Sequence, residues 1–391
     1  MRARSPATHP AKREAPLCDR HHSASTRFKR QTANRNEPVL VVMAFSTYAC
    51  WSNVARGSLA AMLLAVSLFA AGPAGAEIIR KEDTLRGITM TREECAAKPQ
   101  TFWLNVYSQD FCVRYYLSTA GGQGSRPVII LNGDHNGPVD PTRWTWADPS
   151  KASDVNTDKL VAIADHFSKM AKTTAIYLGR IGVEGTSGTH LSRKTLVELH
   201  LMDMALEALR QRYQFEGFHL FGESGGGRLV FGLAQMRRDV ACLISGSGQI
   251  VTRGPARPGD PARTYFDITG KVQWLAQNRA LRMMVISDPY DQQVPTAAQQ
   301  TPMVQTLRQA GHVVPHLLVE ATDPKRHAVL DYGAIAMGGC VLGRHDDEIA
   351  RAIGTLIRRN AETNRRLQDE ARAKSPPQTA SDTIARQPGR S

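Results

Sequence analysis

The sequence predicts an α/β fold in which helices flank both faces of a mostly parallel, doubly wound sheet. Three observations carry this prediction. Short apolar segments alternate with longer helical segments between residues 112 and 357. Several of the short segments, such as Arg126-Pro-Val-Ile-Ile-Leu131, are continuously apolar, as strands covered on both faces are. A glycine-rich turn, Phe221-Gly-Glu-Ser-Gly-Gly-Gly227, joins one strand-like segment to a helical one.

The first 76 residues have the pattern of a removable leader. Residues 1–42 are basic and rich in Pro, Ser, Arg and His. Arg56 then precedes an apolar run over residues 59–71, which ends in the small residues Ala74-Gly-Ala76. This order is typical of a secretory signal peptide, and the apolar run is shorter than the roughly 20 residues of a membrane span. We expect cleavage after Ala76, export to the periplasm or beyond, and no stable membrane anchor afterwards; an uncleaved anchor is the alternative.

The formal net charge of +13 belongs mainly to the two ends of the chain. Residues 1–76 contribute +7 and residues 358–391 contribute +4, which leaves +2 on residues 77–357. Domains that bind nucleic acid usually carry a basic stripe on their folded part. No such stripe is visible, so we expect no nucleic-acid partner.

Four cysteines follow the leader: Cys95, Cys112, Cys242 and Cys340. An even number in an exported chain favours two disulfides. Of the three possible pairings, one closes a short loop with Cys95–Cys112 and ties the sheet to a late helix with Cys242–Cys340. Buried free thiols are the alternative. The chain has no Cys-x-x-Cys or His-rich spacing, so we expect neither a metal nor another cofactor.

The first half of the predicted domain alternates as follows. Residues 77–111 are expected to form an irregular lead-in. Strands are predicted at 112–118, 126–131 and 174–178. Helices are predicted at 156–172 and from 196 onward, because apolar residues recur there with a period near 3.6. These residues are Leu160, Ile163, Ala164, Phe167 and Met170 in one helix and Leu196, Leu199, Met202, Leu206 and Leu209 in the other.

The second half continues with the strand before the glycine-rich turn, the helix after it and a strand at 240–245. Residues 250–281 interrupt the alternation of strands and helices and carry Tyr265, Phe266 and Trp274. We therefore expect a small insertion or cap there. A strand at 282–287, a helix at 299–310, a strand at 315–320 and a helix from 346 follow. The catalytic domain is expected to span 112–358, and the charged tail 359–391 to be largely disordered.

The glycine-rich turn has the Gly-x-Ser-x-Gly pattern of a nucleophile elbow, with Ser224 as the nucleophile. Such a turn leaves no room for side chains two positions either side, which explains Gly222 and Gly226. The backbone N–H of Gly225, at the start of a helix, is suited to stabilise an oxyanion. Glu223 is expected to orient structure or substrate rather than act as a base. A flexible Gly/Ser loop is the alternative interpretation.

A serine nucleophile needs a base to accept its proton and an acid to orient the base. Both Asp288 and Asp291 follow the strand that ends at residue 287, and either carboxylate is also suited to cap a turn. His327 ends the polar loop after the strand at 315–320, so we predict it to be the base. The other late histidines lie before or inside a strand or at the start of a helix: His312, His316 and His345.

The loop Asn132-Gly-Asp-His-Asn-Gly137 follows an early strand. In folds that carry their serine on a nucleophile elbow, such a loop supplies the second oxyanion donor. Here that donor would be the backbone N–H of Asp134. His135 in the same loop is expected to contact the substrate or the loop itself. Trp144 and Trp274 are candidates to line an apolar substrate pocket; core packing is the alternative for both.

Residues 112–357 resemble the α/β-hydrolase superfamily, nearest its prolyl-oligopeptidase-like and dienelactone-hydrolase-like branch. The matching segments are the Asn132-Gly133 loop, with Asn where His is usual, the Gly-Glu-Ser-Gly-Gly elbow, Asp291-x-x-Val-Pro295 and His327. Gly179-Arg-Ile-Gly-Val-Glu-Gly-Thr-Ser-Gly188 also resembles a loop that lies near the active site in that branch. The resemblance covers the catalytic domain only, and it favours Asp291 over Asp288 as the acid.

The resemblance implies an exported serine hydrolase that forms an acyl-enzyme. Its expected substrates are small-molecule esters and, less readily, short peptides or amides. A catalytically silent binding protein of the same fold and an acyltransferase that uses the same nucleophile are the alternatives. The motifs that carry the resemblance specify the nucleophile class and not the substrate.

Overall fold

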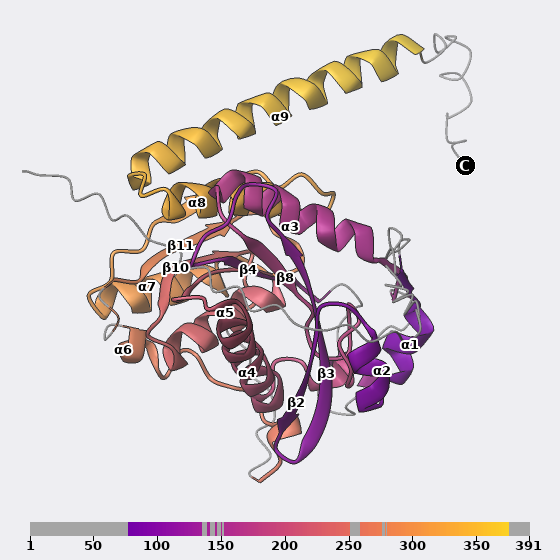
Figure 1. Cartoon of the computed structure of the whole chain (residues 1–391). Coiled ribbons are helices and arrows are strands. Elements are labelled where there is room, and N and C mark those ends of the chain that lie inside the picture. The colour runs from indigo at the N-terminus through magenta and orange to yellow at the C-terminus, as the bar shows by residue number, and fades with distance from the viewer. Residues whose placement is uncertain are drawn as a thin grey trace, which may run out of the picture. The chain divides into compact units, whose positions relative to one another are not determined.

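The computed structural model describes residues 77–134, 139–140, 145–146, 150, 152–250, 259–275, 278 and 280–374 (Figure 1). These residues all belong to one compact unit, Ala70–Ser391. The predicted leader, residues 1–76, lies outside the described residues, as do His135 and Trp144. Among the helices of the described part, none combines the length and apolar character needed to cross a membrane.

An eight-stranded sheet forms the centre of the unit, in the order β12-β11-β10-β9-β4-β8-β3-β2. From β8 to β12 all neighbouring strands are parallel, whereas β3 runs antiparallel to both β8 and β2. The predicted mostly parallel α/β sheet is therefore confirmed. Its strands are β2 (Thr101–Val106), β3 (Gln109–Ser118), β4 (Val128–Leu131), β8 (Ala175–Leu178), β9 (Phe218–Glu223), β10 (Val240–Gly246), β11 (Arg282–Ser287) and β12 (His316–Leu318).

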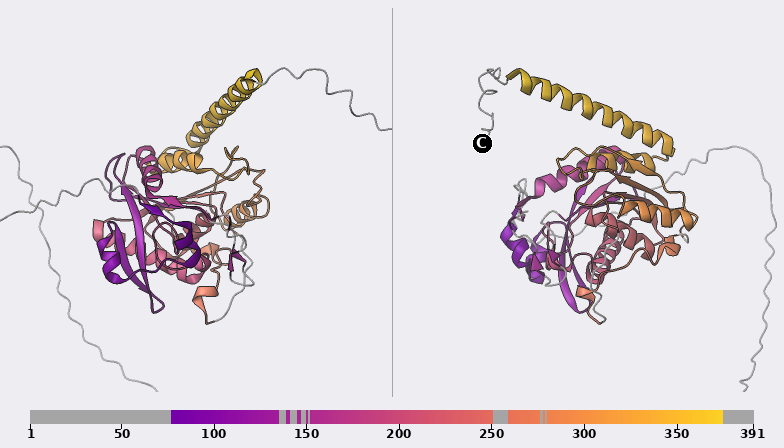
Figure 2. Two further views of the ribbon diagram at one scale, coloured as in Figure 1. Left: turned by 90° about the vertical axis from the view of Figure 1, so that its right-hand side faces the viewer. Right: turned by 180° about the vertical axis from the view of Figure 1, so that it is seen from behind.

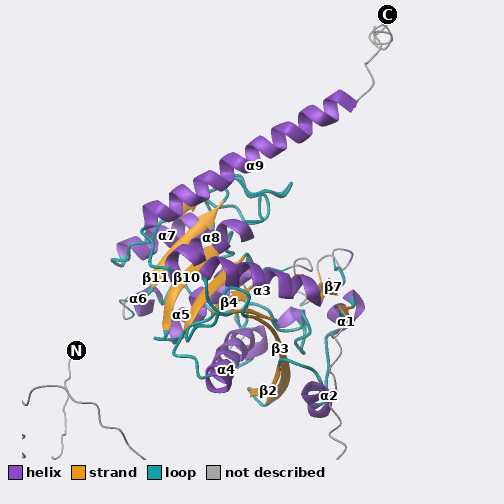
Figure 3. Ribbon diagram, turned by 45° about the horizontal axis from the view of Figure 1, so that its top comes forward, coloured by secondary structure: helices purple, strands orange, loops and turns teal. Residues whose placement is uncertain are grey.

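Helices flank both faces of this sheet (Figures 2 and 3). The α-helices are α1 (Lys81–Arg86), α2 (Arg92–Ala97), α3 (Thr157–Ala171), α4 (Leu196–Tyr213), α5 (Gly225–Met236), α6 (Val272–Leu275), α7 (Gln300–Gln309), α8 (Leu330–Val341) and α9 (Asp346–Lys374). Two short 3-10 helices, η2 (His190–Ser192) and η3 (Pro261–Arg263), lie in connecting loops. Two small two-stranded pairings complete the structure: β1 (Ile78–Ile79) with β7 (Val155–Asn156), and β5 (Val139–Asp140) with β6 (Thr145–Trp146).

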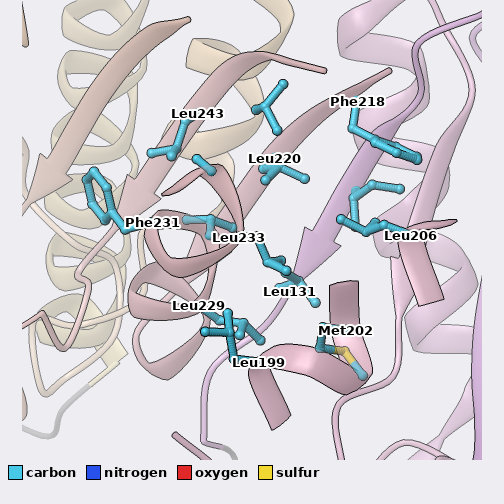
Figure 4. Close-up of a cluster of buried hydrophobic side chains, with 14 of the residues drawn as sticks. Leu131, Leu199, Met202, Leu206, Phe218, Leu220, Leu229, Phe231, Leu233 and Leu243 are labelled. Carbon is cyan, nitrogen blue, oxygen red and sulfur yellow. The ribbon is translucent and has the colours of Figure 1, made fainter. Parts of the chain in front are cut away.

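Alternate residues of the central strands β4, β8, β9, β10 and β11 enter two separate hydrophobic clusters, because side chains of a strand point to opposite faces. Ile129 and Leu131 of β4 belong to the cluster shared with α4, α5 and α7. Val128 and Ile130 belong to the cluster shared with α3, α8 and α9. Figure 4 shows part of the first cluster, in which leucines and phenylalanines of β4, β9 and β10 face those of α4 and α5. The doubly wound arrangement follows from these two apolar faces.

The expectation of an irregular lead-in over residues 77–111 is wrong. This segment contains α1, α2 and the edge strand β2, which pairs with β3 in a tight hairpin. The two turn residues, Tyr107 and Ser108, both have positive φ, at 50° and 60°. Such turns usually carry Asn or Gly, so the sequence lacked the ordinary hairpin signal.

The bounds of helix α8 were not predicted from the sequence, although the pairing Cys242–Cys340 assumed that Cys340 lies in a late helix. The helix is apolar around most of its circumference and contains three glycines, so no helical period stands out. All three glycines permit close contacts, since a Cβ at Gly333 would clash with the Phe221 ring, one at Gly338 with the backbone of Met170 and one at Gly339 with Ile349. Helix α8 is therefore enclosed by α3, α9 and the sheet rather than lying on the surface.

Both disulfides expected from the even cysteine count are present. Cys95–Cys112 joins α2 to β3, and Cys242–Cys340 joins β10 to α8. Helix α9 extends to Lys374, so much of the tail expected to be disordered is helical, and residues 375–391 lie outside the described part. Ile349 and Ile353 anchor its first half in the second cluster.

Candidate active site

Ser224 occupies the sharp turn between β9 and α5. Its φ of 55° and ψ of −118° are an unfavourable combination for a residue with a side chain. Backbone hydrogen bonds hold it there: Ser224 N–H donates to the Gly246 carbonyl (2.8 Å), and the Ser224 carbonyl accepts from Gly227 (3.0 Å) and Gln249 (2.9 Å). The strained turn is thus fixed from both the helix and the neighbouring strand β10.

The glycines two positions either side of Ser224 are required by close packing. A Cβ at Gly222 would clash with the carbonyl group of Gly226, and a Cβ at Gly226 would clash with the carbonyl group of Leu131. The Gly-x-Ser-x-Gly pattern therefore has the steric reason that the sequence suggested. It brings the end of β9, the start of α5 and the end of β4 into direct contact.

The predicted site residues follow the carboxyl ends of four parallel strands. Asp134 follows β4, Ser224 follows β9, Asp291 follows β11 and His327 follows β12. Carboxyl ends of parallel strands lie along one edge of a sheet, where open α/β folds bind their ligands. The topology therefore places these residues at one edge although nearly 200 residues of chain separate the first from the last.

Asp291 and His327 contact each other directly. His327 Nδ1 lies 2.8 Å from Asp291 Oδ2, while Asp291 Oδ1 accepts from the N–H groups of Gln293 and Val294, each at 2.8 Å. The carboxylate is buried, with 0% of its side chain exposed, and the imidazole is 13% exposed. Asp291 thus has both oxygens occupied and fixes the orientation of the imidazole through Nδ1.

The charge environment favours the protonated form of His327. Burial alone would lower the pKa of His327, but its hydrogen bond to Asp291 and the negative charges of Asp291, Glu223 and Asp323 outweigh burial and raise the pKa above 6.5. Asp323 also fixes the loop, since its Oδ1 accepts from the N–H groups of His327 and Ala328, each at 2.6 Å. Asp323 was not predicted from the sequence, although an Asp followed by Pro at a loop start is a common turn signal.

Asp288, the other candidate acid, has different partners. Its Oδ2 accepts from Arg326 Nε (2.6 Å) and from the N–H of Ala321 (2.8 Å), and its Oδ1 accepts from the N–H of Tyr290 (2.8 Å). These contacts tie the loop after β11 to the loop after β12. Of the two candidates, only Asp291 is hydrogen-bonded to His327.

Glu223 connects the elbow to the loop that bears His327. Its Oε1 accepts from the N–H of Val329 at 2.8 Å. Burial raises the pKa of Glu223 to about 6, although the Val329 N–H and the charge of His327 favour the carboxylate. Within the described residues no hydrogen bond joins Ser224 Oγ to His327; such bonds are often long in unliganded sites.

The loop Asn132–Asp134 lies against the elbow. A Cβ at Gly133 would be 2.8 Å from Ser224 Cβ, and a Cβ at Gly225 would clash with the carboxylate of Asp134. Asn132 Oδ1 accepts the N–H of Gly133 at 2.8 Å. The N–H of Asp134 has no hydrogen-bond partner in the described part of the chain, and Gly225, as the first residue of α5, has an N–H without an intrahelical acceptor.

A buried ionic cluster surrounds the side chain of Asp134 and was not foreseen from the sequence. Arg180 Nη1 lies 3.0 Å from Asp134 Oδ1, Arg193 Nη1 lies 2.9 Å from the same oxygen, and Lys194 Nζ lies 2.7 Å from Oδ2. Burial would raise the pKa of Asp134, but these three cations hold the pKa well below 3.8. Arg180 belongs to the loop Gly179–Gly188. The resemblance of this loop to one near the active site of related hydrolases was the one feature of the sequence that pointed to Arg180.

The described part of the predicted cap, residues 250–281, contributes mainly to the core. Phe266, Ile268 and Val272 are buried in the first cluster, and the Phe266 ring lies 4.7 Å from the guanidinium of Arg228. Trp274 on α6 is 42% exposed, and its ring contacts Lys271 Nζ at 5.3 Å. The structure records no contact between Trp274 and the residues around Ser224 within its described part.

The described residues contain no cluster of three or more His, Cys, Asp and Glu side chains suited to a metal ion. The sheet edge that carries Ser224 also carries the imidazole–carboxylate pair of His327 and Asp291, together with the backbone N–H groups of Gly225 and Asp134. This is the set of groups that nucleophilic acyl transfer uses.

No protein-family model and no curated protein matches the chain. Among solved structures, it is similar to Est1E from Butyrivibrio proteoclasticus bound to ferulic acid, with 13% identity, a TM-score of 0.43 and coverage of 62% of this chain and 98% of that one. It is also similar to the Pyrococcus furiosus esterase Pf2001, with 11% identity, a TM-score of 0.42 and coverage of 69% and 94%. A puromycin-hydrolysing peptidase from Mycobacterium tuberculosis shares 14% identity with a TM-score of 0.44, over 64% of this chain and 40% of that one.

At these identities and TM-scores, the likenesses say nothing about the substrate of this chain. The fold follows from its own strand order and from the strained serine turn at the carboxyl edge of a parallel sheet. That combination is the α/β-hydrolase type of fold predicted from the sequence.

Proposed function

We propose that this protein is a serine hydrolase that cleaves esters of small molecules through Ser224, His327 and Asp291. The observation that carries the proposal is the strained Ser224 turn, which stands at the same sheet edge as the hydrogen-bonded pair of His327 and Asp291. A binding protein would have no need of a strained serine and an oriented imidazole together. Peptides and amides are the less favoured substrates.

In the first stage, Ser224 Oγ attacks the substrate carbonyl carbon while His327 Nε2 accepts the hydroxyl proton. Asp291 stays ionised; it holds the Nδ1–H and stabilises the imidazolium. The N–H groups of Gly225 and Asp134 donate to the oxyanion of the tetrahedral intermediate. The carbon–oxygen bond to the leaving alcohol then breaks, and the alcohol takes the proton from His327.

In the second stage, water attacks the acyl-enzyme and passes a proton to His327. The tetrahedral intermediate collapses, Ser224 Oγ recovers that proton, and the carboxylic acid leaves. The sum is ester plus water giving acid plus alcohol, with no external cofactor required.

We also propose that the protein is exported after removal of residues 1–76. The signal-like pattern before Ala76 supports export, and so do the two disulfides, Cys95–Cys112 and Cys242–Cys340, since disulfides persist mainly in oxidising compartments. N-terminal sequencing of protein recovered from the periplasm and the medium tests this proposal. A mature chain that retains residues before Glu77 would contradict the cleavage site.

The activity is tested by labelling the mature protein with a fluorophosphonate probe, with Ser224→Ala as the matched control. We expect labelling of the wild type and none of the variant. A series of p-nitrophenyl esters beside an aminoacyl p-nitroanilide then separates esterase from peptidase activity. Absence of a Ser224-dependent adduct in folded protein would overturn the proposal.

A further inference from the structure

Six charged side chains cluster beside the loop Asn132–Asp134. Three are cations (Arg180, Arg193 and Lys194) and three are carboxylates (Asp134, Glu184 and Glu198). Arg180 and Glu198 are fully buried and form a two-pronged ion pair at 2.8 and 3.0 Å. Because burying ions costs free energy that pairing only partly offsets, such a cluster is a poor way to stabilise a fold. Its contacts suggest a different purpose.

The two arginines hold the carbonyl groups of the loop. Arg180 Nη1 donates to the carbonyl of Asn132 at 2.9 Å, and Arg193 Nη1 donates to the carbonyl of Gly133 at 3.3 Å. A trans peptide is planar, with its N–H pointing opposite to its C=O. Since Arg193 fixes the Gly133 carbonyl, it also fixes the direction of the N–H of Asp134, which points away from Arg193.

The side chain of Asp134 anchors the same peptide from the other side. Its carboxylate is held by Arg180, Arg193 and Lys194, while the preceding N–H, that of Gly133, is occupied by Asn132 Oδ1. The loop is therefore restrained at two carbonyls, one N–H and one carboxylate. Of the N–H groups in the two peptides whose carbonyls the arginines hold, that of Gly133 is occupied and that of Asp134, the oxyanion donor in the proposed mechanism, has no acceptor within the described residues.

We propose that Arg193, together with Arg180, is a positioning residue that aims the N–H of Asp134 at the oxyanion. The inference rests on the proposed function. Neither arginine contacts the substrate; both act through the loop. Pre-oriented donors stabilise a transition state because they need no reorganisation during the reaction. A shift of the loop by a fraction of an ångström therefore lowers the rate more than it weakens substrate binding.

Arg193 is the better residue to test. Arg180 is the ion-pair partner of buried Glu198, so its removal leaves a buried charge and threatens the fold. Arg193 hydrogen-bonds through Nη1 alone; its buried Nε and Nη2 have no partner within the described structure. Replacing Arg193 therefore affects the loop while Asp134 keeps Arg180 and Lys194.

For Arg193→Met, we expect kcat on p-nitrophenyl butyrate to fall about 10–100-fold while KM changes less than about 3-fold. The thionoester analogue of the same substrate gives a second readout. Sulfur is a weak hydrogen-bond acceptor, so hydrolysis of the thionoester uses the oxyanion donors poorly. The wild type should prefer the oxygen ester strongly, and Arg193→Met should lose much of that preference.

Arg114→Met is the matched control, because Arg114 is also a buried arginine but pairs with Glu77 at 2.8 Å. It should lower thermal stability without changing the ratio of rates on the two substrates. Compared with Arg193→Met, Arg193→Lys restores the positive charge and a donor group, so it should recover part of the lost kcat. If Arg193→Met fails to fold, Arg193→Lys is the variant to compare with the wild type.

Fluorophosphonate labelling of the wild type distinguishes failure of the proposed function from failure of this inference. If Ser224-dependent labelling is absent, the proposed function fails. If labelling is present and folded Arg193→Met keeps the wild-type kcat and substrate ratio, this inference alone is wrong. An equal loss on both substrates, as a general loss of structure would cause, also overturns it, as does an Arg193→Lys that recovers nothing.

Discussion

Asp288 and Asp291 are three positions apart, yet their carboxylates have different partners. Asp291 is bonded to His327 Nδ1 and to two backbone N–H groups, whereas Asp288 pairs with Arg326 and binds the loop after β12. Asp291 holds His327, whereas Asp288 joins two loops. The two residues therefore offer a matched pair of isosteric substitutions.

Asp291→Asn should lower kcat by about 10⁴-fold, because the amide holds the wrong imidazole tautomer and cannot stabilise the imidazolium. Asp288→Asn should retain most of the activity and lose thermal stability, since it breaks the ion pair with Arg326. Steady-state kinetics on one p-nitrophenyl ester and thermal unfolding of both variants check this. The reverse pattern would assign the acid to Asp288.

On the acidic limb of its pH profile, kcat/KM should decrease as the pH falls. The midpoint of this decrease should lie above pH 6.5. The base must be neutral to accept a proton, and the pKa of His327 is raised above that value. The stability that protonated His327 gains from Asp291 is fully present below the unfolded pKa and is lost as pH rises through the raised folded pKa. Activity and this stabilisation therefore change in opposite directions over the same pH range.

Glu223 also has a pKa of about 6, so Glu223→Gln is the control for the acidic limb. Glutamine keeps an acceptor for the N–H of Val329 but does not titrate. The limb should remain and move only slightly to lower pH, because the negative charge of Glu223 raises the pKa of His327. If the acidic limb disappears in Glu223→Gln, the titrating group is Glu223 and not His327.

At the scale of elements, helix α8 depends on its neighbours more than on its own sequence. Cys340 links it to Cys242 near the amino end of β10, whereas Ser224 and His327 lie at the carboxyl edge of the sheet. The disulfide closes a loop with a sequence separation of 98, compared with 17 for Cys95–Cys112. In the chain-entropy model, the longer loop gives the larger stabilisation.

Replacing Cys242 and Cys340 by serine should lower the free energy of unfolding by about 2–4 kcal/mol and leave kcat nearly unchanged. The Cys95/Cys112 double variant should lose less. Urea unfolding of the wild type and of both double variants measures the difference, and intact mass with and without reductant checks that the bonds form. A larger loss from the short loop would show that strain or packing outweighs chain entropy.

At the scale of the whole molecule, α9 has two parts with different surroundings. Ile349 and Ile353 are buried against α8, and Asn360 Nδ2 donates to Tyr332 Oη at 3.3 Å. The side chains of Glu362, Thr363, Arg365 and Arg366 are exposed. The first part of the helix covers the core, whereas these four side chains of the later part are exposed.

Truncation after Glu362 should therefore leave the thermal midpoint within a few degrees of the wild type, whereas truncation before Asp346 should destabilise the fold strongly. The longer deletion exposes the apolar surface of α8 that Ile349 and Ile353 cover. Thermal unfolding followed by circular dichroism compares the two. Strong destabilisation by the shorter deletion would mean that the exposed part of α9 has a partner, such as a second copy of the chain.

Much of the fold was readable from the sequence because the signals are local. Buried strands are short apolar runs, amphipathic helices have a 3.6-residue period, and the elbow needs glycines at fixed offsets from Ser224. Helices α1 and α2, strand β2 and the bounds of helix α8 were not predicted, and for β2 and α8 the reason is equally local. The β2–β3 hairpin turns at Tyr107 and Ser108 without the usual Asn or Gly, and α8 is enclosed and lacks a polar face.

From the sequence alone we could predict the alternation of the central strands and helices, the turn at Ser224 and the preference for His327 among the late histidines. The residues themselves left Asp288 and Asp291 open, with the family resemblance favouring Asp291, and the folded structure shows that Asp291 contacts His327 and that Arg180, Arg193 and Lys194 hold Asp134. These partners come from loops far apart in the chain, and they meet because parallel strands end at one edge of the sheet. Local patterns carry no information about which of several nearby charges will pair across that edge, because pairing depends on the packing of the whole sheet.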